Sequence, residues 1–228
     1  MSALFAMLAR KPEPGKVKPG LAECLGAPAA AKVYRSCMMD LCERFARLSV
    51  PARVLAYAPR GARKAVSLLA SRQWRLMAQE GAGTGQALAG LFEYAWRMGL
   101  QRTVVLLSDC PTVPSEFIID AFDRLLVVDV VLGPTTDGRV YLVGMSLERP
   151  ELLMGIDWEG TEVFDALVDR IDAFGLVLGL VPHWYEVEDR AGLDRLASHL
   201  RALALMGDEE LPRRTQMLLE RLRLAEGE

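Results

Sequence analysis

Hydrophobic and polar positions along the chain fall into two alternating kinds of segment. Short runs that are apolar at consecutive positions occupy six stretches. Each run has about the length of a buried strand, and several are rich in valine and leucine, as a parallel sheet covered on both faces requires. We therefore predict strands over residues 2–9, 52–58, 102–108, 127–133, 140–145 and 176–182.

Between these runs the apolar residues recur with a spacing near 3.6, which is typical of amphipathic helices. Strands that alternate with helices indicate an α/β fold with a mostly parallel sheet. In such a fold we expect the runs 2–9 and 102–108 to be neighbouring central strands. Gly99 and Gly175 stand where glycine commonly ends a helix. The predicted helices cover residues 29–48, 85–99, 115–126 and 161–175.

The length of 228 residues fits one large domain. After Gly207 the stretch LPRRTQMLLERLRL has the pattern of a terminal amphipathic helix. We therefore expect a body over residues 1–206 and a helical tail over residues 207–228. Three roles are open to this tail, namely packing on the body, formation of a homodimer and contact with a membrane surface. Packing on the body is favoured.

Charge and cysteine content narrow the partners and the compartment. The formal net charge is −3, whereas a nucleic-acid-binding domain is normally basic, so we expect no nucleic-acid partner. The four cysteines form neither a CxxC pair nor a zinc spacing, so we expect free thiols in a reducing compartment. The apolar opening SALFAMLA is shorter than a membrane span and follows no basic region. These features predict a cytoplasmic protein without a transmembrane segment.

Candidate chemistry gathers after the predicted strands, where ligands of an open α/β sheet bind. The loop RKPEPGKVKPGL, residues 10–21, follows the first strand and holds three of the five lysines of the chain. Its candidate anion contacts are Gly15, which lets the backbone approach a phosphate, and Lys16 and Lys18, which supply mobile positive charge. The loop lacks the GxxxxGK[ST] pattern of a P-loop. Both an anion cradle and a solvated surface loop fit this composition.

Two further strand ends and a late acidic segment carry carboxylates. Asp109, in SDCP, follows the strand 102–108 and offers the hard oxygen that Mg²⁺ and Mn²⁺ prefer, although a cap on the next turn is an equal alternative. Asp137, in GPTTDGR, lies in an ordinary Asp-Gly turn. Glu186 and Glu188, in WYEVED, fall on one side of an extended segment, where they either hold a cation or are solvated.

Taken together, these stretches resemble a family of bacterial glycosyltransferase-A-type proteins, uncharacterised transferases associated with radical-SAM proteins. The family pattern runs K-P-x-P-G-x-V-K-T-R-L, L-G-x-R-M, G-S-D-C-P, G-P-x-x-D-G-G-Y-Y-L-x-G, I-x-W-S-T and D-V-D. The stretches in this chain are KPEPGKVKPGL, TGQAL, LSDCP, GPTTDGRVYLVG, IDWEGT and EVE. They occur in that order over residues 3 to about 197, and KPxPGxVK, SDCP and GPxxDG are specific as a set.

The resemblance implies a nucleotide-diphospho-sugar transferase fold, in which helices flank a twisted mixed sheet. It also implies a metal-dependent transferase that uses a nucleotide-sugar and a divalent cation, Mg²⁺ or Mn²⁺, with an acceptor that stays unidentified. At matching positions, Lys18 becomes a phosphate contact, Asp109 the metal ligand and Asp137 a second polar group near the sugar or the metal. Glu186 and Glu188 stand at the aspartates of D-V-D and become further candidate metal ligands.

Two arginines of the family pattern are absent, because their positions hold Gly20 and Ala87. An arginine fork recognises phosphate through two hydrogen bonds, which lysine cannot replace. Arg139, at the second glycine of D-G-G, is the candidate phosphate contact that would compensate. If the site has drifted instead, Pro19→Thr together with Gly20→Arg should restore the family's Thr-Arg and raise nucleotide affinity.

Two alternatives to a glycosyltransferase therefore stay open. One is a guanylyltransferase-like nucleotidyltransferase that releases pyrophosphate, since such enzymes share the sheet and a late acidic motif. The other is a catalytically degenerate protein that only binds a nucleotide or another partner.

Overall fold

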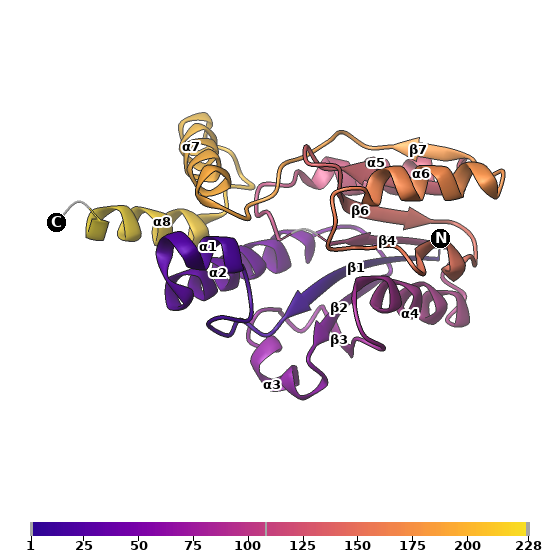
Figure 1. Ribbon diagram of the computed structural model, residues 1–228, viewed down its shortest axis with the longest axis horizontal. Helices are drawn as coiled ribbons and strands as arrows, with labels where there is room; N and C mark the ends of the chain where they lie inside the picture. Colours follow the sequence, from indigo (N-terminus) through magenta and orange to yellow (C-terminus); the bar gives the residue numbers. More distant parts are fainter. Residues whose placement is uncertain (1, 108, 227–228) are drawn as a thin grey trace.

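A seven-stranded sheet lies between two layers of helices in the computed structural model, which describes residues 2–107 and 109–226 (Figure 1). The strand order is β3-β2-β1-β4-β6-β5-β7. Strand β6 runs antiparallel to β4 and β5, and the other pairings among the described strands are parallel. This mixed, mostly parallel sheet confirms the predicted fold class. The strands are β1 (Ala3–Arg10), β2 (Ala52–Ala58), β3 (Arg75–Ala78), β4 (Arg102–Leu106), β5 (Val130–Pro134), β6 (Val140–Met145) and β7 (Leu178–Leu180).

The four helices predicted from spacing correspond to α2, α4, α5 and α6. Sequence patterns did not reveal α1, α3, β3 or α7. Helices α1 and α3 and strand β3 have seven residues or fewer, so none of these three presents a long periodic pattern. The helices are α1 (Pro19–Leu25), α2 (Ala27–Phe45), α3 (Arg63–Val66), α4 (Thr84–Arg97), α5 (Ser115–Arg124), α6 (Val163–Ala173), α7 (Arg190–Met206) and α8 (Arg213–Glu226), with short 3₁₀ turns η1 (Arg60–Ala62) and η2 (Pro150–Leu153).

Several predicted boundaries move. The loop predicted over residues 10–21 contains the start of α1, because Pro19 suits the first turn of a helix. The strand predicted over 176–182 shortens to β7, which pairs only with β5 among the described strands. The strand predicted over 127–133 begins at Val130. The last residue of the strand predicted over 102–108 lies outside the described residues.

Both faces of the sheet are apolar because helices cover each of them. On β1, Phe5 and Met7 belong to the core cluster that includes α2 and α5, whereas Leu4 and Ala6 belong to the cluster that includes α4 and α6. All four side chains are completely buried. A strand covered on both faces therefore reads as a continuous apolar run, which is why the sequence pattern located β1.

Strands β1 and β4 are parallel neighbours, as predicted, with Ala3 opposite Arg102 and Met7 opposite Leu106. Their carboxyl ends therefore open at the same edge of the sheet. In Figure 1, helices α1, α7 and α8 lie at the end of the sheet toward which β1 points. This arrangement brings the loop after β1 and the segment after β4 together.

Helix α8 packs on α2. Asp40 of α2 accepts hydrogen bonds from the backbone N–H and the hydroxyl of Thr215, each 2.8 Å long. Thr215 is completely buried, and Leu219 one turn later is 5% exposed. The described part of the predicted tail thus contacts the body. Residues 227–228 lie outside the described residues, and the division at 206/207 stays a prediction. Among the helices described, none is both long and apolar enough to cross a bilayer.

Replacing Phe5 with alanine should lower the free energy of unfolding by about 3–5 kcal/mol, because a large buried ring is lost and a cavity remains. The Phe5 ring lies 5.2 Å from the ring of Phe45 between their centroids. Urea denaturation followed by circular dichroism measures the change. Ile119→Ala is the control, because that side chain is 50% exposed and should cost less than about 0.5 kcal/mol. Equal costs for the two variants would contradict the assigned core.

Candidate functional site

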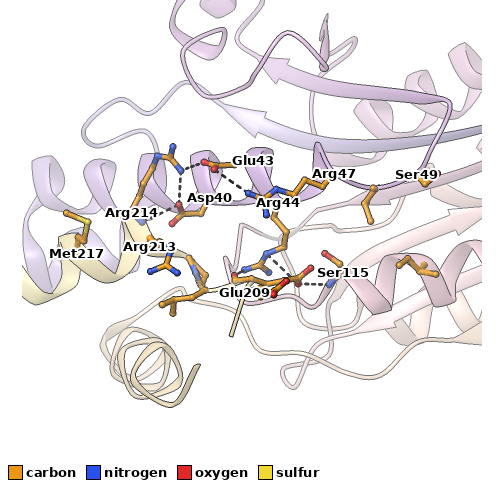
Figure 2. Close-up of a pocket in the computed structure, with 15 residues that line it drawn as sticks. Asp40, Glu43, Arg44, Arg47, Ser49, Ser115, Glu209, Arg213, Arg214 and Met217 are labelled. Carbon is orange, nitrogen blue, oxygen red and sulfur yellow. Dashed lines mark hydrogen bonds and ion pairs between the residues drawn. The ribbon is translucent and has the colours of Figure 1, made fainter. Parts of the chain in front are cut away.

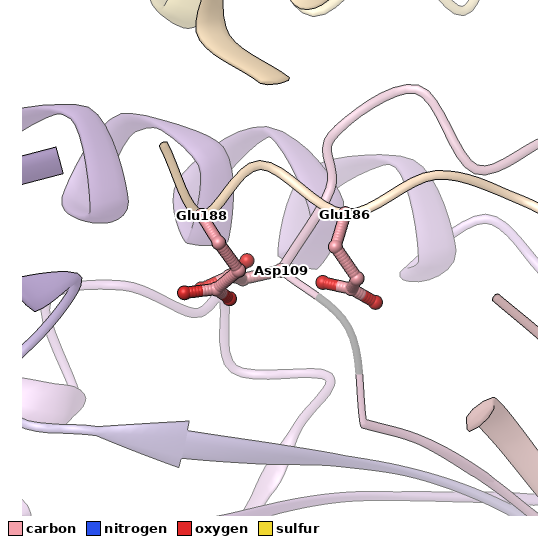
Figure 3. A group of neighbouring side chains, drawn as sticks. All are labelled: Asp109, Glu186 and Glu188. Atoms are coloured by element: carbon pink, nitrogen blue, oxygen red, sulfur yellow. The ribbon is translucent and has the colours of Figure 1, made fainter. Parts of the chain in front are cut away.

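Three carboxylates from distant parts of the chain meet beyond the ends of β1 and β4. Asp109 follows β4, while Glu186 and Glu188 lie in the extended segment before α7. One carboxylate oxygen from each lies within 4.8 Å of the other two. Figure 3 shows both glutamates reaching from the same segment toward Asp109. Val187 between them is buried at 2% exposure, so alternation along an extended segment turns the two glutamates to the opposite side.

Lys18 joins this cluster from the loop after β1. Its Nζ lies 2.6 Å from Oδ1 of Asp109 and 2.7 Å from Oε1 of Glu188. The side chain is only 7% exposed. The backbone is left-handed (φ 51°, ψ 61°) and precedes α1, where the Lys18 carbonyl accepts a hydrogen bond from the N–H of Ala22. We call Lys18, Asp109, Glu186 and Glu188 the charged cluster.

The electrostatics of the cluster follow from its burial. Burial alone would lower the pKa of Lys18, but Asp109, Glu188 and Glu186 outweigh it and raise that pKa above its usual value. Lys18 is therefore a permanent cation. Burial also raises the pKa of Asp109, Glu188 adds to the rise, and Lys18 opposes it. Within these four residues, three carboxylates against one ammonium leave a surplus of negative charge.

The donor set of the cluster fits a divalent cation. Carboxylate oxygens are the hard ligands that Mg²⁺ and Mn²⁺ prefer, and the three carboxylates lie close enough to share one ion. The surplus negative charge favours such an ion as well. Lys18 already contacts one oxygen of Asp109 and one of Glu188, so an ion and the ammonium would share the same ligands.

The other lysines of the loop are placed differently. Lys16 is exposed, and its backbone N–H donates to the carbonyl of Glu13. Lys11 pairs with the Glu13 carboxylate at 2.9 Å, also near the surface. Gly15 has φ 75°, a conformation in which a side chain would be strained. Gly15 and Lys16 thus lie in the turn that leads to Lys18, and Lys18 alone of these three lysines enters the cluster.

Asp137 and Arg139 form a separate pair in the turn between β5 and β6. Asp137 accepts a hydrogen bond from the hydroxyl of Thr135, and its Oδ2 lies 3.5 Å from Nε of Arg139. Strand β6 runs antiparallel to β4, so the start of β6 lies beside the end of β4, where the N–H of Leu107 donates to the carbonyl of Tyr141 at 2.8 Å. The turn before β6 therefore lies at the same edge of the sheet as the charged cluster. Asp137 is not one of the three grouped carboxylates. The guanidinium of Arg139 therefore already has a carboxylate beside it.

Sequence reasoning missed the residues that hold the acidic segment in place. The hydroxyl of Tyr185 lies 2.7 Å from Oγ1 of Thr112 and 3.0 Å from Nδ1 of His199. These contacts join the segment after β4, the segment before α7, and α7 itself. Burial lowers the pKa of His199, which favours its neutral ring. No short motif links three positions so far apart in the chain.

A cavity of about 560 Å³ lies between α2, the start of α5 and the start of α8 (Figure 2). Two arginines that line it already have hydrogen-bond or ion-pair partners within the protein. Arg44 donates to the carbonyls of Val113 and Glu210, and Arg214 pairs with Asp40 and Glu43. The cavity contains no residue of the charged cluster. We interpret the contacts around this cavity as structural, because they hold α8 and the loop before α5 against α2.

Gly20 lets α1 contact the acidic segment. A Cβ added at Gly20 would collide with the backbone oxygen of Glu188. An arginine at this position therefore does not fit unless the segment moves away, which argues against the expectation that it would simply restore phosphate binding. The second arginine position, Ala87, is buried in α4 at 4% exposure.

The sequence profile of one bacterial family, described as "Uncharacterized protein conserved in bacteria (DUF2064)", matches residues 41–160. This range is more than half of the chain. It includes Asp109, Asp137 and Arg139 and ends before the two glutamates. No curated protein matches the chain.

Solved structures share the fold. A crystal structure from Desulfovibrio desulfuricans G20, of a protein provisionally named a nucleotide-diphospho-sugar transferase, has a TM-score of 0.85 and 27% identity and covers 98% of this chain and 97% of its own. A 4-diphosphocytidyl-2C-methyl-D-erythritol synthase from Anaerococcus prevotii DSM 20548 has a TM-score of 0.61 and 8% identity over 88% and 97% of the chains. An inositol-1-phosphate CTP transferase from T. maritima has a TM-score of 0.52 and 10% identity over 96% of each chain. The fold is that of nucleotide-diphospho-sugar transferases, as the resemblance implied.

The contact at Gly20 predicts the sign of a stability change. Alanine normally stabilises a helix relative to glycine by about 1 kcal/mol, but Gly20→Ala should instead destabilise the fold by about 1–3 kcal/mol, because it overpacks the contact with Glu188. Gly90→Ala in α4 is the matched control, since its new Cβ meets its nearest neighbour, Cβ of Glu80, at 3.8 Å. Thermal unfolding of the two variants should show shifts of opposite sign. A stabilised Gly20→Ala variant would disprove the close contact.

Proposed function

This chain belongs to the family of uncharacterized proteins conserved in bacteria (DUF2064), and on that premise we propose that it is a metal-dependent transferase with a nucleotide-diphospho-sugar donor. The observation that carries the proposal is the charged cluster at the carboxyl ends of β1 and β4. Ligands of open α/β sheets bind at this edge. The family resemblance of the three motifs and the fold supports the same donor class.

In this proposal Asp109, Glu186 and Glu188 hold Mg²⁺ or Mn²⁺. The ion, when bound, would neutralise the charge that develops on the departing nucleoside diphosphate. Gly15, Lys16 and Lys18 face the phosphates from the loop after β1. Lys18 supplies a positive charge that burial in the cluster does not remove.

The pair of Asp137 and Arg139 serves the sugar or the phosphates from the turn between β5 and β6. Oδ2 of Asp137 lies 3.5 Å from Nε of Arg139, so its charge partly neutralises the guanidinium. We therefore assign the pair a polar positioning role beside the charged cluster. The acceptor stays unidentified.

A nucleotidyltransferase is the second candidate, because two structures with this fold are a diphosphocytidyl-methylerythritol synthase and a CTP transferase. In that reaction the attacked phosphate stays with the product and pyrophosphate departs. Identification of the released product separates the two candidates, because glycosyl transfer releases a nucleoside diphosphate. Nucleotide binding with no release of either product would instead indicate a degenerate binding protein.

The cysteines support a reducing compartment, since Cys24, Cys37, Cys42 and Cys110 are all free thiols. Burial raises the pKa of Cys110 to about 11, so this thiol beside Asp109 is neutral at physiological pH and does not act as a nucleophile. We propose that the protein works in the cytoplasm. Formation of a homodimer stays a prediction.

Asp109→Asn should abolish Mn²⁺-dependent nucleotide binding and leave the fold intact. Loss of groups that only support a metal ligand commonly costs 10–100-fold in affinity, so loss of the ligand itself should exceed about 100-fold. Thermal shift and calorimetry with nucleoside diphosphates and nucleotide-sugars, with and without Mn²⁺, measure the effect. Asp120→Asn on the exposed face of α5 is the matched control. Undiminished binding by the Asp109 variant would leave this residue as a turn cap.

A further inference from the structure

The ammonium of Lys18 lies where a divalent cation would need its ligands. It contacts Oδ1 of Asp109 at 2.6 Å and Oε1 of Glu188 at 2.7 Å, so two of the three candidate ligands already hold a cation. Like charges repel strongly in a buried site, where water screens them little. A metal ion that enters the cluster must therefore overcome the ammonium or displace it.

The position of Lys18 is built into the backbone. Among the described residues, Lys18 is the one non-glycine residue with a positive φ. Gly20 two residues later contacts the backbone of Glu188 so closely that no side chain fits. A left-handed residue that the surroundings fix in place is a common feature of ligand sites. The backbone holds Lys18 at the acidic segment, whereas its long, flexible side chain can carry the ammonium to another anion.

A nucleoside diphosphate would provide that second anion. The loop that contains Gly15 and Lys16 leads directly into Lys18, at the edge of the sheet where ligands of this fold class bind. The negatively charged phosphates can replace the carboxylates as the ion-pair partner of the Lys18 ammonium. Asp109 and Glu188 then exchange the ammonium for the metal ion, so that each set of negative charges faces a cation.

We propose that Lys18 is a positioning residue that exchanges partners, from Asp109 and Glu188 in the free protein to the donor phosphates when a divalent cation occupies the carboxylates. The exchange makes the metal and the nucleoside diphosphate bind cooperatively. This inference rests on the proposed function for its nucleotide half, whereas competition between Lys18 and the metal rests on the charged cluster alone.

Binding of Mn²⁺ without nucleotide tests the competition. Electron paramagnetic resonance of free Mn²⁺ and calorimetry give the affinity. Lys18→Met keeps an unbranched side chain one atom shorter and removes its charge, so it should bind Mn²⁺ at least about tenfold more tightly than the wild type. Lys18→Arg keeps the charge and should bind Mn²⁺ as weakly as the wild type. Lys64→Met removes an exposed charge from α3, outside the charged cluster, and should change the affinity by less than about twofold.

A double-ligand cycle tests the exchange. Mn²⁺ affinity is measured with and without each of UDP, GDP, ADP and CDP, and the ratio is the coupling, which is the same for either ligand. Mn²⁺ also attracts phosphate directly, so the coupling that remains in Lys18→Met measures that direct part. The wild-type coupling should be at least about tenfold larger than that of Lys18→Met.

Each result decides a defined point. Mn²⁺ affinity in Lys18→Met equal to or below that of the wild type overturns the competition and makes Lys18 a structural counter-ion. Equal coupling in the two proteins overturns the exchange. If no nucleotide binds to any variant, the proposed function fails, while the Mn²⁺ measurements still decide the competition. If circular dichroism shows that Lys18→Met does not fold, Lys18→Gln takes its place in both tests.

Discussion

The contact between the Lys18 ammonium and the carboxylates of Asp109 and Glu188 is the constraint on which the site depends. It ties together the loop after β1, the segment after β4 and the segment before α7. None of these stretches is regular secondary structure at the contact. Ion pairs therefore hold them together there, whereas backbone hydrogen bonds between strands hold the sheet. A buried charge without a partner is costly, and each of these three side chains therefore restrains the other two.

The sheet explains why this contact forms at one edge. Strands β1 and β4 are parallel neighbours in the middle of the sheet, and both faces carry completely buried apolar side chains such as Phe5 and Leu4. With both faces covered, polar groups can gather only at the edges where strands end. Tyr185, bonded to Thr112 and His199, then fixes the acidic segment over that edge.

The structure gives a reason why arginine does not fit at either of the two positions where the family pattern has it. Gly20 is not an empty position, because the backbone of Glu188 occupies the space that a side chain would need. Ala87 is buried in α4. The loss of the arginine at position 20 and the close approach of Glu188 to Lys18 are thus one structural feature. Under the proposed function, a site without these arginines would depend more strongly on Lys18 and on a divalent cation to balance the donor phosphates.

The sequence by itself determined the layers of the fold and pointed to the four residues of the charged cluster. Continuous apolar runs located β1, β2, β4 and β6, because strands buried on both faces need no polar side, and spacing near 3.6 located α2, α4, α5 and α6. The positions of Asp109 and Lys18 after apolar runs, and the period of two in Glu186-Val187-Glu188, identified the charged residues. Short elements such as β3 and α1 escaped because they have too few residues for a periodic signal.

Only the tertiary structure decided how those residues meet. The composition of the loop did not separate Lys16 from Lys18, and only the family resemblance singled out Lys18. The fold buries Lys18 and leaves Lys16 exposed. It could not show that Asp137 pairs with Arg139 rather than joining the three carboxylates. Contacts across 170 residues, such as that of Lys18 with Glu188, leave no periodic trace in the chain. They arise from the packing of segments that only the completed sheet brings together.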